Sequence, residues 1–265
     1  MKFLQNFFSN QNIFIPAVRW VLNSYPFKKT ATRFPNFSRF LRNRFATNKF
    51  ISLPLTFLLV SFIANLMLLF EIAEDFENSP VMHAIDNSLA QFLFDLRITT
   101  VANIFYYFSL LGSLPVVILV ALAATILLLI KKKYVHLIAL ITALTGTGIT
   151  VLTGKNYFLR LRPKNLGFYS EASYSFPSGH ATVAMAFYGM LFYIFIRSTP
   201  TYKNKFRLFV LAVLFISLLG FSRLYLGVHY LSDVIAGFSL GLLWLLSAIS
   251  ILEWKTYSLQ TGIHK

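Results

Sequence analysis

The 265-residue chain contains several apolar runs that approach the length of about 20 residues a helix needs to cross a bilayer. Hydrophobic residues make up 57% of the sequence and charged residues only 12%, whereas a soluble domain has roughly 25% charged residues. This pattern predicts an all-α integral membrane protein with several spans rather than a large soluble core. Cysteine is absent, which excludes disulfides, thiolate metal sites and a cysteine nucleophile.

Six apolar segments are expected to form a bundle of membrane-spanning helices. The predicted spans are about 50–70, 114–130, 135–154, 179–197, 207–226 and 231–251. The apolar segment 98–130 is too long for one span, because a straight helix of that length would measure about 50 Å against a hydrocarbon core of about 30 Å. Gly112, Ser113 and Pro115 provide a break, so an extra interfacial or re-entrant helix is expected near 82–111, between spans one and two.

The placement of the basic residues predicts the orientation. Eighteen of the 24 Lys and Arg residues fall in the first 50 residues, the Lys131–Lys133 loop, the loop after span four and the C-terminal tail. Because positive charge is retained on the cytoplasmic side, both termini are expected there and the acidic stretch 71–95 outside. The predicted organisation is a basic cytoplasmic or interfacial arm at 1–49, a six-span domain at 50–252 and a cytoplasmic tail at 253–265.

The formal net charge of +15 is explained by this placement and does not indicate a nucleic-acid partner. The arm 1–49 contains nine Lys or Arg residues and no Asp or Glu, so it is expected to lie on anionic lipid. A partner-binding or nucleic-acid-binding arm remains an alternative, although no motif supports it. The sequence does not indicate an oligomeric state.

The remaining basic residues lie on the predicted outer side, where positive charge next to spans is disfavoured. They are Arg97, Lys155, Arg160, Arg162, Lys164 and Arg223. In a six-span arrangement spans three and five end on the outer side, and spans four and six begin there. The segments 155–163, 178–180 and 223–233 are therefore expected to face the same compartment.

These segments together suit a phosphate group. Lys155 and Arg162 are two helical turns apart, so both can point the same way, and with Arg223 they match a phosphate's charge. Ser178 and Gly179 open span four, where free N–H groups, a hydroxyl donor and a missing side chain favour a bound anion.

A histidine and an aspartate complete the predicted site. His229 and Asp233 are four residues apart, which puts them on one face if the helix has begun. The carboxylate can then hold one imidazole nitrogen and leave the other free to attack or to move a proton. His180 would lie beside the same anion. Asp233 is the one acid expected there, so no carboxylate cluster for a divalent metal is predicted.

Each feature taken singly has a structural explanation. A lone cation can extend from a helix end to the interface, and Pro-Ser-Gly is an ordinary helix start. Arg160, Lys164 and Glu171 are interpreted as solvated loop charges, and Tyr169 and Tyr174 as interfacial aromatics. The convergence of three cations, two histidines, a helix start and a histidine-paired aspartate on one side favours a phosphate site.

These residues resemble the type 2 phosphatidic acid phosphatase superfamily of membrane lipid phosphatases. That family carries the motifs Lys-x6-Arg-Pro, Pro-Ser-Gly-His and Ser-Arg-x5-His-x3-Asp. All eleven positions match in order and spacing: Lys155, Arg162, Pro163, Pro177, Ser178, Gly179, His180, Ser222, Arg223, His229 and Asp233. The motif-bearing resemblance spans about 135–250, whereas the arm 1–49 has no counterpart.

The resemblance implies a residue-by-residue mechanism. His229 would attack phosphorus and form a phosphohistidine, while Asp233 orients it and stabilises its charge. His180 would protonate the leaving lipid oxygen and then activate water. The implied phosphate ligands are Lys155, Arg162, Ser178, Gly179 and Arg223. Because three fixed cations can neutralise the developing charge, neither a metal nor a cofactor is expected.

The resemblance also implies a lipid phosphate or diphosphate phosphatase with its site at the outer leaflet of a bacterial plasma membrane. The expected substrate is undecaprenyl diphosphate, followed by phosphatidylglycerophosphate, phosphatidate or lipid A. A phosphotransferase with an alcohol acceptor is an alternative, and so is a lipid transporter without catalysis, although no inverted repeat supports transport. The related vanadium haloperoxidases have similar motifs, but they are not expected to have six membrane spans.

Overall fold

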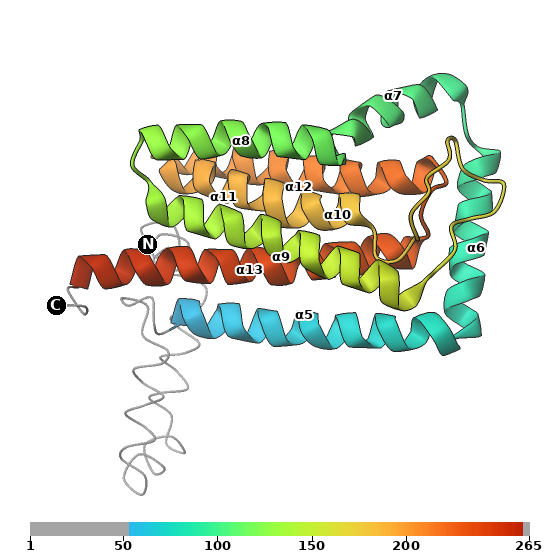
Figure 1. The fold of residues 1–265 in the computed structure, drawn as a ribbon, viewed down its shortest axis with the longest axis horizontal. Helices are drawn as coiled ribbons and strands as arrows, with labels where there is room; N and C mark the ends of the chain where they lie inside the picture. The colour runs from blue at the N-terminus through green and yellow to red at the C-terminus, as the bar shows by residue number, and fades with distance from the viewer. Residues whose placement is uncertain (1–52, 262–265) are drawn as a thin grey trace, which may run out of the picture. The chain divides into compact units, whose positions relative to one another are not determined.

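The computed structural model describes residues 53–261, and every regular element there is a helix (Figure 1). The chain divides into two units, one of residues 1–61 with 250–265 and one of residues 62–249. The basic arm predicted at 1–49 lies outside the described residues. Of the first unit, the structure describes only the start of the first helix and the end of the last. The second unit contains the helices and loops that build the site.

The helices follow one another closely along the chain. They are α5 (Leu53–Asn78), α6 (Pro80–Asp95), α7 (Thr99–Ser109), the 3-10 turn η1 (Leu110–Gly112), α8 (Leu114–Ile130), α9 (Tyr134–Phe158), α10 (Gly179–Val183), the π-helical turn η2 (Ala184–Tyr188), α11 (Gly189–Ser198), α12 (Tyr202–Tyr225) and α13 (Leu231–Thr261). The predicted tail is therefore helical as far as residue 261. Within the second unit, α8 to α12 and the start of α13 run alongside one another, and α6 crosses one end of these helices (Figure 1).

Four helices are long and apolar enough to cross a membrane. They are Tyr134–Phe158, Gly179–Ser198, Tyr202–Tyr225 and Leu231–Thr256. These helices coincide with the last four predicted spans. Residues Thr99–Gly112 and Leu114–Ile130 add a fifth candidate if their pair, bent by 48°, forms one broken span. The protein is thus an all-helical membrane protein with four to five candidate spans among the described residues, while a count of six stays a prediction.

The segment between α5 and α8 contains two helices where the sequence predicted one. The predicted break at Gly112 and Ser113 is present, because Ser113 has an extended backbone between η1 and α8. A second break separates α6 from α7. There Nε of Arg97 donates to the carbonyl of Tyr225 at 3.0 Å, and the Tyr225 hydroxyl accepts from the Ile98 amide at 3.0 Å. These contacts with the end of α12 hold the turn, and no local sequence signal reveals them.

Two glycines bring α13 close to α10. A Cβ at Gly237 would lie 2.7 Å from the carbonyl oxygen of Ser178, and one at Gly241 would lie 2.5 Å from that of Thr182. Small residues four apart let helix backbones approach in this way. As a result, the amide of Ser178 reaches the carbonyl of Asp233 at 3.0 Å. The start of α10 and the start of α13 are therefore locked together.

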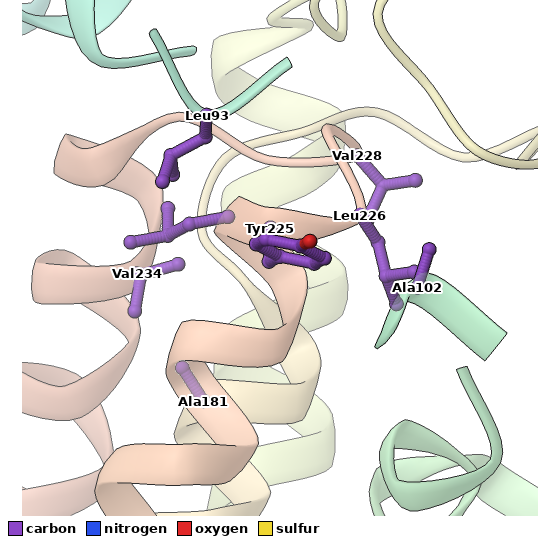
Figure 2. Close-up of a cluster of buried hydrophobic side chains, with 8 residues drawn as sticks. Leu93, Ala102, Ala181, Tyr225, Leu226, Val228 and Val234 are labelled. Atoms are coloured by element: carbon purple, nitrogen blue, oxygen red, sulfur yellow. The ribbon is translucent and has the colours of Figure 1, made fainter. Parts of the chain in front are cut away.

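A buried hydrophobic cluster supports the connection between α12 and α13. Its members are Leu93, Ala102, Ala181, Leu224, Tyr225, Leu226, Val228 and Val234 (Figure 2). They come from α6, α7, α10, α12, α13 and the connection itself. Gly227 makes the turn within this connection with φ +67°, a backbone conformation that residues with side chains rarely adopt. The cluster fixes the backbone on both sides of His229.

Candidate active site

The three predicted motifs meet at the end of the helices that α6 crosses. Lys155 lies in the last turn of α9, and Arg162 lies in the loop that follows. Ser178 precedes α10, and His229 lies between α12 and α13. The segments expected to share one compartment therefore do share one end of the second unit. The packing of α10 against both α9 and α12 contributes to this arrangement.

His229 is held by the start of α13 with only 2% of its surface exposed. Its Nδ1 lies 3.4 Å from Oδ2 of Asp233, and this oxygen also accepts from the Tyr230 amide at 2.9 Å. The hydroxyl of Ser175 donates to the same oxygen at 2.5 Å and lies 3.2 Å from Nδ1. Nδ1 thus faces the carboxylate, which leaves Nε2 as the nitrogen able to react.

The protonation state of His229 suits a nucleophile. Burial lowers the pKa of the imidazole to about 4, although the hydrogen bond to Asp233 opposes this shift. The ring is therefore neutral near pH 7. Nη1 of Arg162 lies 3.2 Å from Nε2 and adds a nearby positive charge.

Arg162 and Arg223 together hold an internal carboxylate, that of Glu171. Nη2 of Arg162 lies 2.5 Å from Oε2 of Glu171, and Nη2 of Arg223 pairs with Oε1. The Tyr169 hydroxyl donates to Oε1 at 2.9 Å and accepts from Nη1 of Arg223 at 2.5 Å. Burial alone would raise the pKa of Glu171, but the guanidinium groups of Arg223 and Arg162 lower it to about 2. The two arginines therefore bind an oxyanion in this structure.

Glu171 and Tyr169 differ from their sequence interpretation. Glu171 was expected to be a solvated loop charge, but its side chain is 20% exposed and paired with two arginines. Tyr169 was expected to be an interfacial aromatic, but its hydroxyl joins Glu171 to Arg223. Both differences arise because the loop 159–178 folds back over the helix ends, where the amide of Phe168 donates to the carbonyl of Leu226 at 2.8 Å.

Lys155 and Ser178 flank the two arginines. Nζ of Lys155 donates to the carbonyl of Tyr174 at 2.7 Å and to the hydroxyl of Ser173 at 2.9 Å. Ser178 is fully buried, and its hydroxyl has no hydrogen-bond partner among the described residues. Nε of Arg223 is likewise buried and unpartnered within residues 53–261. Buried polar atoms normally have partners, so these two fit a site that receives an anion.

His180 lies in the first turn of α10, directly after Ser178 and Gly179. Its electrostatic neighbours include Arg223, Glu171, His229 and Lys155. A Cβ at Gly112 would lie 2.6 Å from Cδ2 of the imidazole, so η1 packs directly against the ring. The break predicted between η1 and α8 therefore also shapes the site.

Arg160 and Asp86 are the residues that the sequence interpretation missed. Arg160 was expected to be a solvated loop charge, yet it is 8% exposed, and its Nη1 lies 2.5 Å from Oδ1 of Asp233. Its Nη2 lies 2.7 Å from Oδ2 of Asp86. Asp86 shares the buried face of α6 with Ala90 and Leu93, at helical spacing. The sequence signal for a role of Asp86 was the presence of an acidic residue on the apolar face of a helix.

Comparison with known proteins identifies the domain. Residues 135–257 match the family model described as the PAP2 superfamily. Over this segment, which is less than half of the chain, the protein is similar to that superfamily. All eleven motif positions lie inside the PAP2 match, whereas Asp86 and Gly112 lie outside it.

Two curated relatives match part of this chain. Phosphatidylglycerophosphatase B of Bacillus subtilis is 41% identical over 90 residues, which are 34% of this chain and 44% of that protein. Dihydrosphingosine 1-phosphate phosphatase of Schizosaccharomyces pombe is 31% identical over 110 residues, which are 38% of this chain and 26% of that protein. The matches thus span less than half the length of either relative.

Two solved structures share the PAP2 fold. The crystal structure of the first transmembrane PAP2-type phosphatidylglycerolphosphate phosphatase from Bacillus subtilis matches with a TM-score of 0.64 and 25% identity, over 72% of this chain and 94% of that chain. The crystal structure of Aquifex aeolicus LpxE matches with a TM-score of 0.50 and 26% identity, over 62% of this chain and 93% of that chain. Both comparisons extend well beyond the motifs.

Proposed function

We propose that the chain is a membrane lipid-phosphate phosphatase that acts through a phosphohistidine on His229. The observation that carries this proposal is the carboxylate of Glu171 held between Arg162 and Arg223, close to the ring of His229. A site that binds a carboxylate in this way has the charge and the paired donors to bind a phosphoryl group. The resemblance to phosphatases with lipid substrates supports the same function.

The proposed reaction has two steps. Nε2 of His229 attacks phosphorus, so a nitrogen–phosphorus bond forms while the bond from phosphorus to the lipid oxygen breaks. His180 gives its proton to the departing oxygen. In the second step His180 takes a proton from water, whose oxygen attacks phosphorus and releases His229 and inorganic phosphate. Asp233 stabilises the positive charge on the imidazole in both steps.

Positive charge from the protein balances the charge on the phosphoryl oxygens. Lys155, Arg162 and Arg223 supply three cations, and Ser178 with the Gly179 backbone supplies further donors. We therefore expect no divalent metal in the mechanism. Activity of the purified protein should survive EDTA, and loss of activity with recovery by Mg²⁺ would contradict this expectation.

A groove beside the site provides room for a lipid tail. It is lined by α5, α9 and the residues just before α10, including Phe70, Gly154, Phe176 and Pro177. The lining is almost entirely apolar and adjoins Lys155 and Ser178 in the chain. We propose undecaprenyl diphosphate or a phospholipid phosphate as the substrate, with phosphate at the arginines and the tail in this groove.

The proposed organisation keeps six spans, an interfacial segment between the first two and both termini in the cytoplasm. The site then faces the outer side of the plasma membrane, and the arm 1–49 lies at the cytoplasmic surface. Because the chain has no cysteine, Ser170→Cys would introduce its single thiol at an exposed loop position. A membrane-impermeant maleimide should label this variant, but not Lys132→Cys, in intact cells or spheroplasts. The reverse pattern would refute the proposed orientation.

The function is tested by phosphate release from a panel of lipid mono- and diphosphates. Undecaprenyl diphosphate, phosphatidylglycerophosphate and phosphatidate should be compared, with His229→Gln as the matched inactive variant. We expect release from at least one lipid by the wild-type protein and a loss of about 10³-fold or more in the variant. No release from any lipid, or retained activity in the variant, would overturn the proposal. Addition of glycerol as an acceptor distinguishes hydrolysis from phosphotransfer.

A further inference from the structure

A buried chain of charges connects α6 to the carboxylate that holds His229. Nη2 of Arg160 lies 2.7 Å from Oδ2 of Asp86, and Nη1 lies 2.5 Å from Oδ1 of Asp233. The side chains are 7% exposed for Arg160, 2% for Asp86 and 0% for Asp233. One guanidinium therefore bridges two carboxylates away from solvent.

The three side chains are fixed by further contacts. Asp86 accepts from the amide of Ser232 at 3.0 Å and from its hydroxyl at 2.5 Å. The guanidinium of Arg160 lies over the ring of Tyr230, 4.4 Å from its centroid, and also donates to the Ser232 hydroxyl at 2.7 Å. Tyr230 and Ser232 flank the start of α13, beside Asp233.

The two carboxylate oxygens of Asp233 therefore have different partners. Oδ1 faces Arg160, while Oδ2 faces Nδ1 of His229. A buried carboxylate without a cation would be costly, so Arg160 allows Asp233 to stay ionised while His229 is neutral. The same contact prevents the carboxylate from rotating away from the imidazole.

Asp86 keeps Arg160 from cancelling the charge of Asp233. Arg160 and Asp233 alone would be a neutral pair with little attraction for a positive imidazole. With Asp86 included, the group carries one net negative charge next to His229. When Nε2 bonds to phosphorus, the ring becomes positively charged, and the remaining negative charge stabilises that intermediate.

We infer that Asp86 and Arg160 are positioning residues for phosphoryl transfer: Arg160 fixes the orientation of Asp233, and Asp86 preserves the negative charge that Asp233 offers to His229. This inference rests on the proposed function for its effect on turnover. Neither residue is among the specified positions of the three motifs, and Asp86 comes from a helix outside the PAP2 match. The effect on the charge of His229 is independent of any substrate.

Other charged and titratable groups also face His229 and Asp233. They are Lys155, Arg162, Glu171, His180, Arg223 and Tyr230. These groups remain unchanged when Asp86 or Arg160 is substituted. A difference between such variants therefore reports the bridging chain rather than the rest of the site.

The test measures the charge state of His229 by NMR titration of full-length protein labelled with [¹⁵N]histidine, with His229→Gln used to assign the signal. Asp86→Asn removes a negative charge and should lower the pKa of His229. Arg160→Met removes a positive charge and should raise the pKa. Asp95→Asn, an exposed carboxylate on the same helix that pairs with Gln91, should leave the pKa unchanged. Shifts in the same direction, or no shift in Asp86→Asn, would overturn the inference.

Turnover provides the second measurement. Turnover is measured with the lipid phosphate that gives activity in the panel. Asp86→Asn should lower kcat at least about tenfold, because a loss of charge stabilisation equal to one pKa unit corresponds to a factor of ten. The KM should change little. Arg160→Lys keeps the positive charge that Arg160→Met removes, so the pKa of His229 should be close to its wild-type value. Its kcat should nevertheless be low, because an ammonium cannot bridge both carboxylates in the same geometry. A kcat restored fully by Arg160→Lys would overturn the orienting role.

The two proposals can fail separately. If the wild-type protein releases no phosphate from any lipid, the proposed function fails, while opposite pKa shifts in Asp86→Asn and Arg160→Met would still establish the charge relation. If the wild-type protein is active and the shifts are absent, the inference fails alone. Should Arg160→Met not fold, Asp86→Asn and Arg160→Lys decide the matter.

Discussion

Nη1 of Arg162 lies 3.2 Å from Nε2 of His229, the imidazole nitrogen that faces away from the carboxylate. The same Nη1 donates to the carbonyl of Val228 at 2.6 Å, which fixes the arginine to the loop that carries the histidine. A cation so close to the attacking nitrogen would meet the phosphoryl oxygens as the new bond forms. The arrangement thus joins the anion-binding group to the nucleophile.

Arg162→Lys tests this connection. Lysine keeps the charge but cannot reach Val228, Ser173 and a phosphate together, because it lacks the planar group that makes these contacts. We expect kcat/KM for a lipid phosphate to fall by about 10²-fold, a common effect of losing one electrostatic contact in a transition state. Lys164→Met, an exposed cation in the same loop, should remain close to wild type. A variant as active as wild type would show that charge alone suffices.

Acid should inactivate and destabilise the protein over two successive pH ranges that overlap slightly. The folded pKa of His229, about 4, lies below the ordinary value of 6.5, so its contribution to stability is complete above pH 6.5 and is lost as the pH falls through 4. For this buried ring the difference corresponds to about 3 kcal/mol. The lowered pKa of Glu171, about 2 against 4.5, extends the loss from pH 4.5 down through 2.

The pH profile checks this prediction. On the acid side, kcat/KM should decline as His229 gains a proton, with the midpoint well below 6.5. Wild type should lose thermal stability relative to His229→Gln as the pH falls from 6.5 towards 4, since the variant has no imidazole to protonate. A wild-type unfolding temperature that does not fall relative to that of the variant over this range would contradict the assigned shift.

Glu171→Gln should strengthen inhibition by vanadate. In the structure the carboxylate pairs with Arg162 and Arg223, so a bound phosphoryl group must displace it. A neutral amide competes less well for the two guanidinium groups, and we expect the inhibition constant to fall by about tenfold, corresponding to roughly 1.4 kcal/mol. Inhibition curves for wild type, Glu171→Gln and Glu171→Asp provide the measurement. Weaker inhibition of the glutamine variant would mean that Glu171 assists anion binding.

Gly112→Ala should impair the proton donor selectively. The added methyl group would meet Cδ2 of His180 at 2.6 Å and the side chain of Leu219 at 2.9 Å, so the imidazole must move. A lipid alkoxide is a poor leaving group that needs a proton, whereas an aryl oxide needs it less. We therefore expect a larger fall with phosphatidate than with para-nitrophenyl phosphate, as in His180→Ala. Equal losses on both substrates would argue against His180 as the acid. Gly148→Ala, whose Cβ would meet no atom within 4 Å, is the matched control.

The sequence predicted that the motif residues would lie together, but it did not predict the contacts that organise them. The spacing of Lys155, Arg162, His229 and Asp233, with the order of the apolar runs, was enough to place the motifs at one end of the helices. Motif spacing and the lengths of the apolar runs were sufficient for this placement, because both can be taken directly from the sequence. The count of six spans and the orientation stay predictions.

The loop 159–178 shows why the rest could not be predicted. Its polar composition is typical of a solvated loop, and Glu171 and Arg160 were interpreted accordingly. Their burial depends on long-range partners, Arg223 for the first and Asp86 for the second, which lie 52 and 74 positions away. The split between α6 and α7 likewise depends on Tyr225 from a distant helix. Local periodicity places Asp86 on the apolar face of α6, but it does not identify the distant residue with which a buried charge pairs.

The hydrogen bond from Phe168 to Leu226, at 2.8 Å, has a consequence for how substrate enters. It ties the loop that carries Glu171 to the connection that carries His229, and Arg162 ties them again through Val228. These two hydrogen bonds hold the loop and the connection together beside the ion pairs that Glu171 makes with Arg162 and Arg223. A phosphate that binds the two arginines would have to replace the Glu171 carboxylate, so entry at the headgroup end is an exchange of one anion for another.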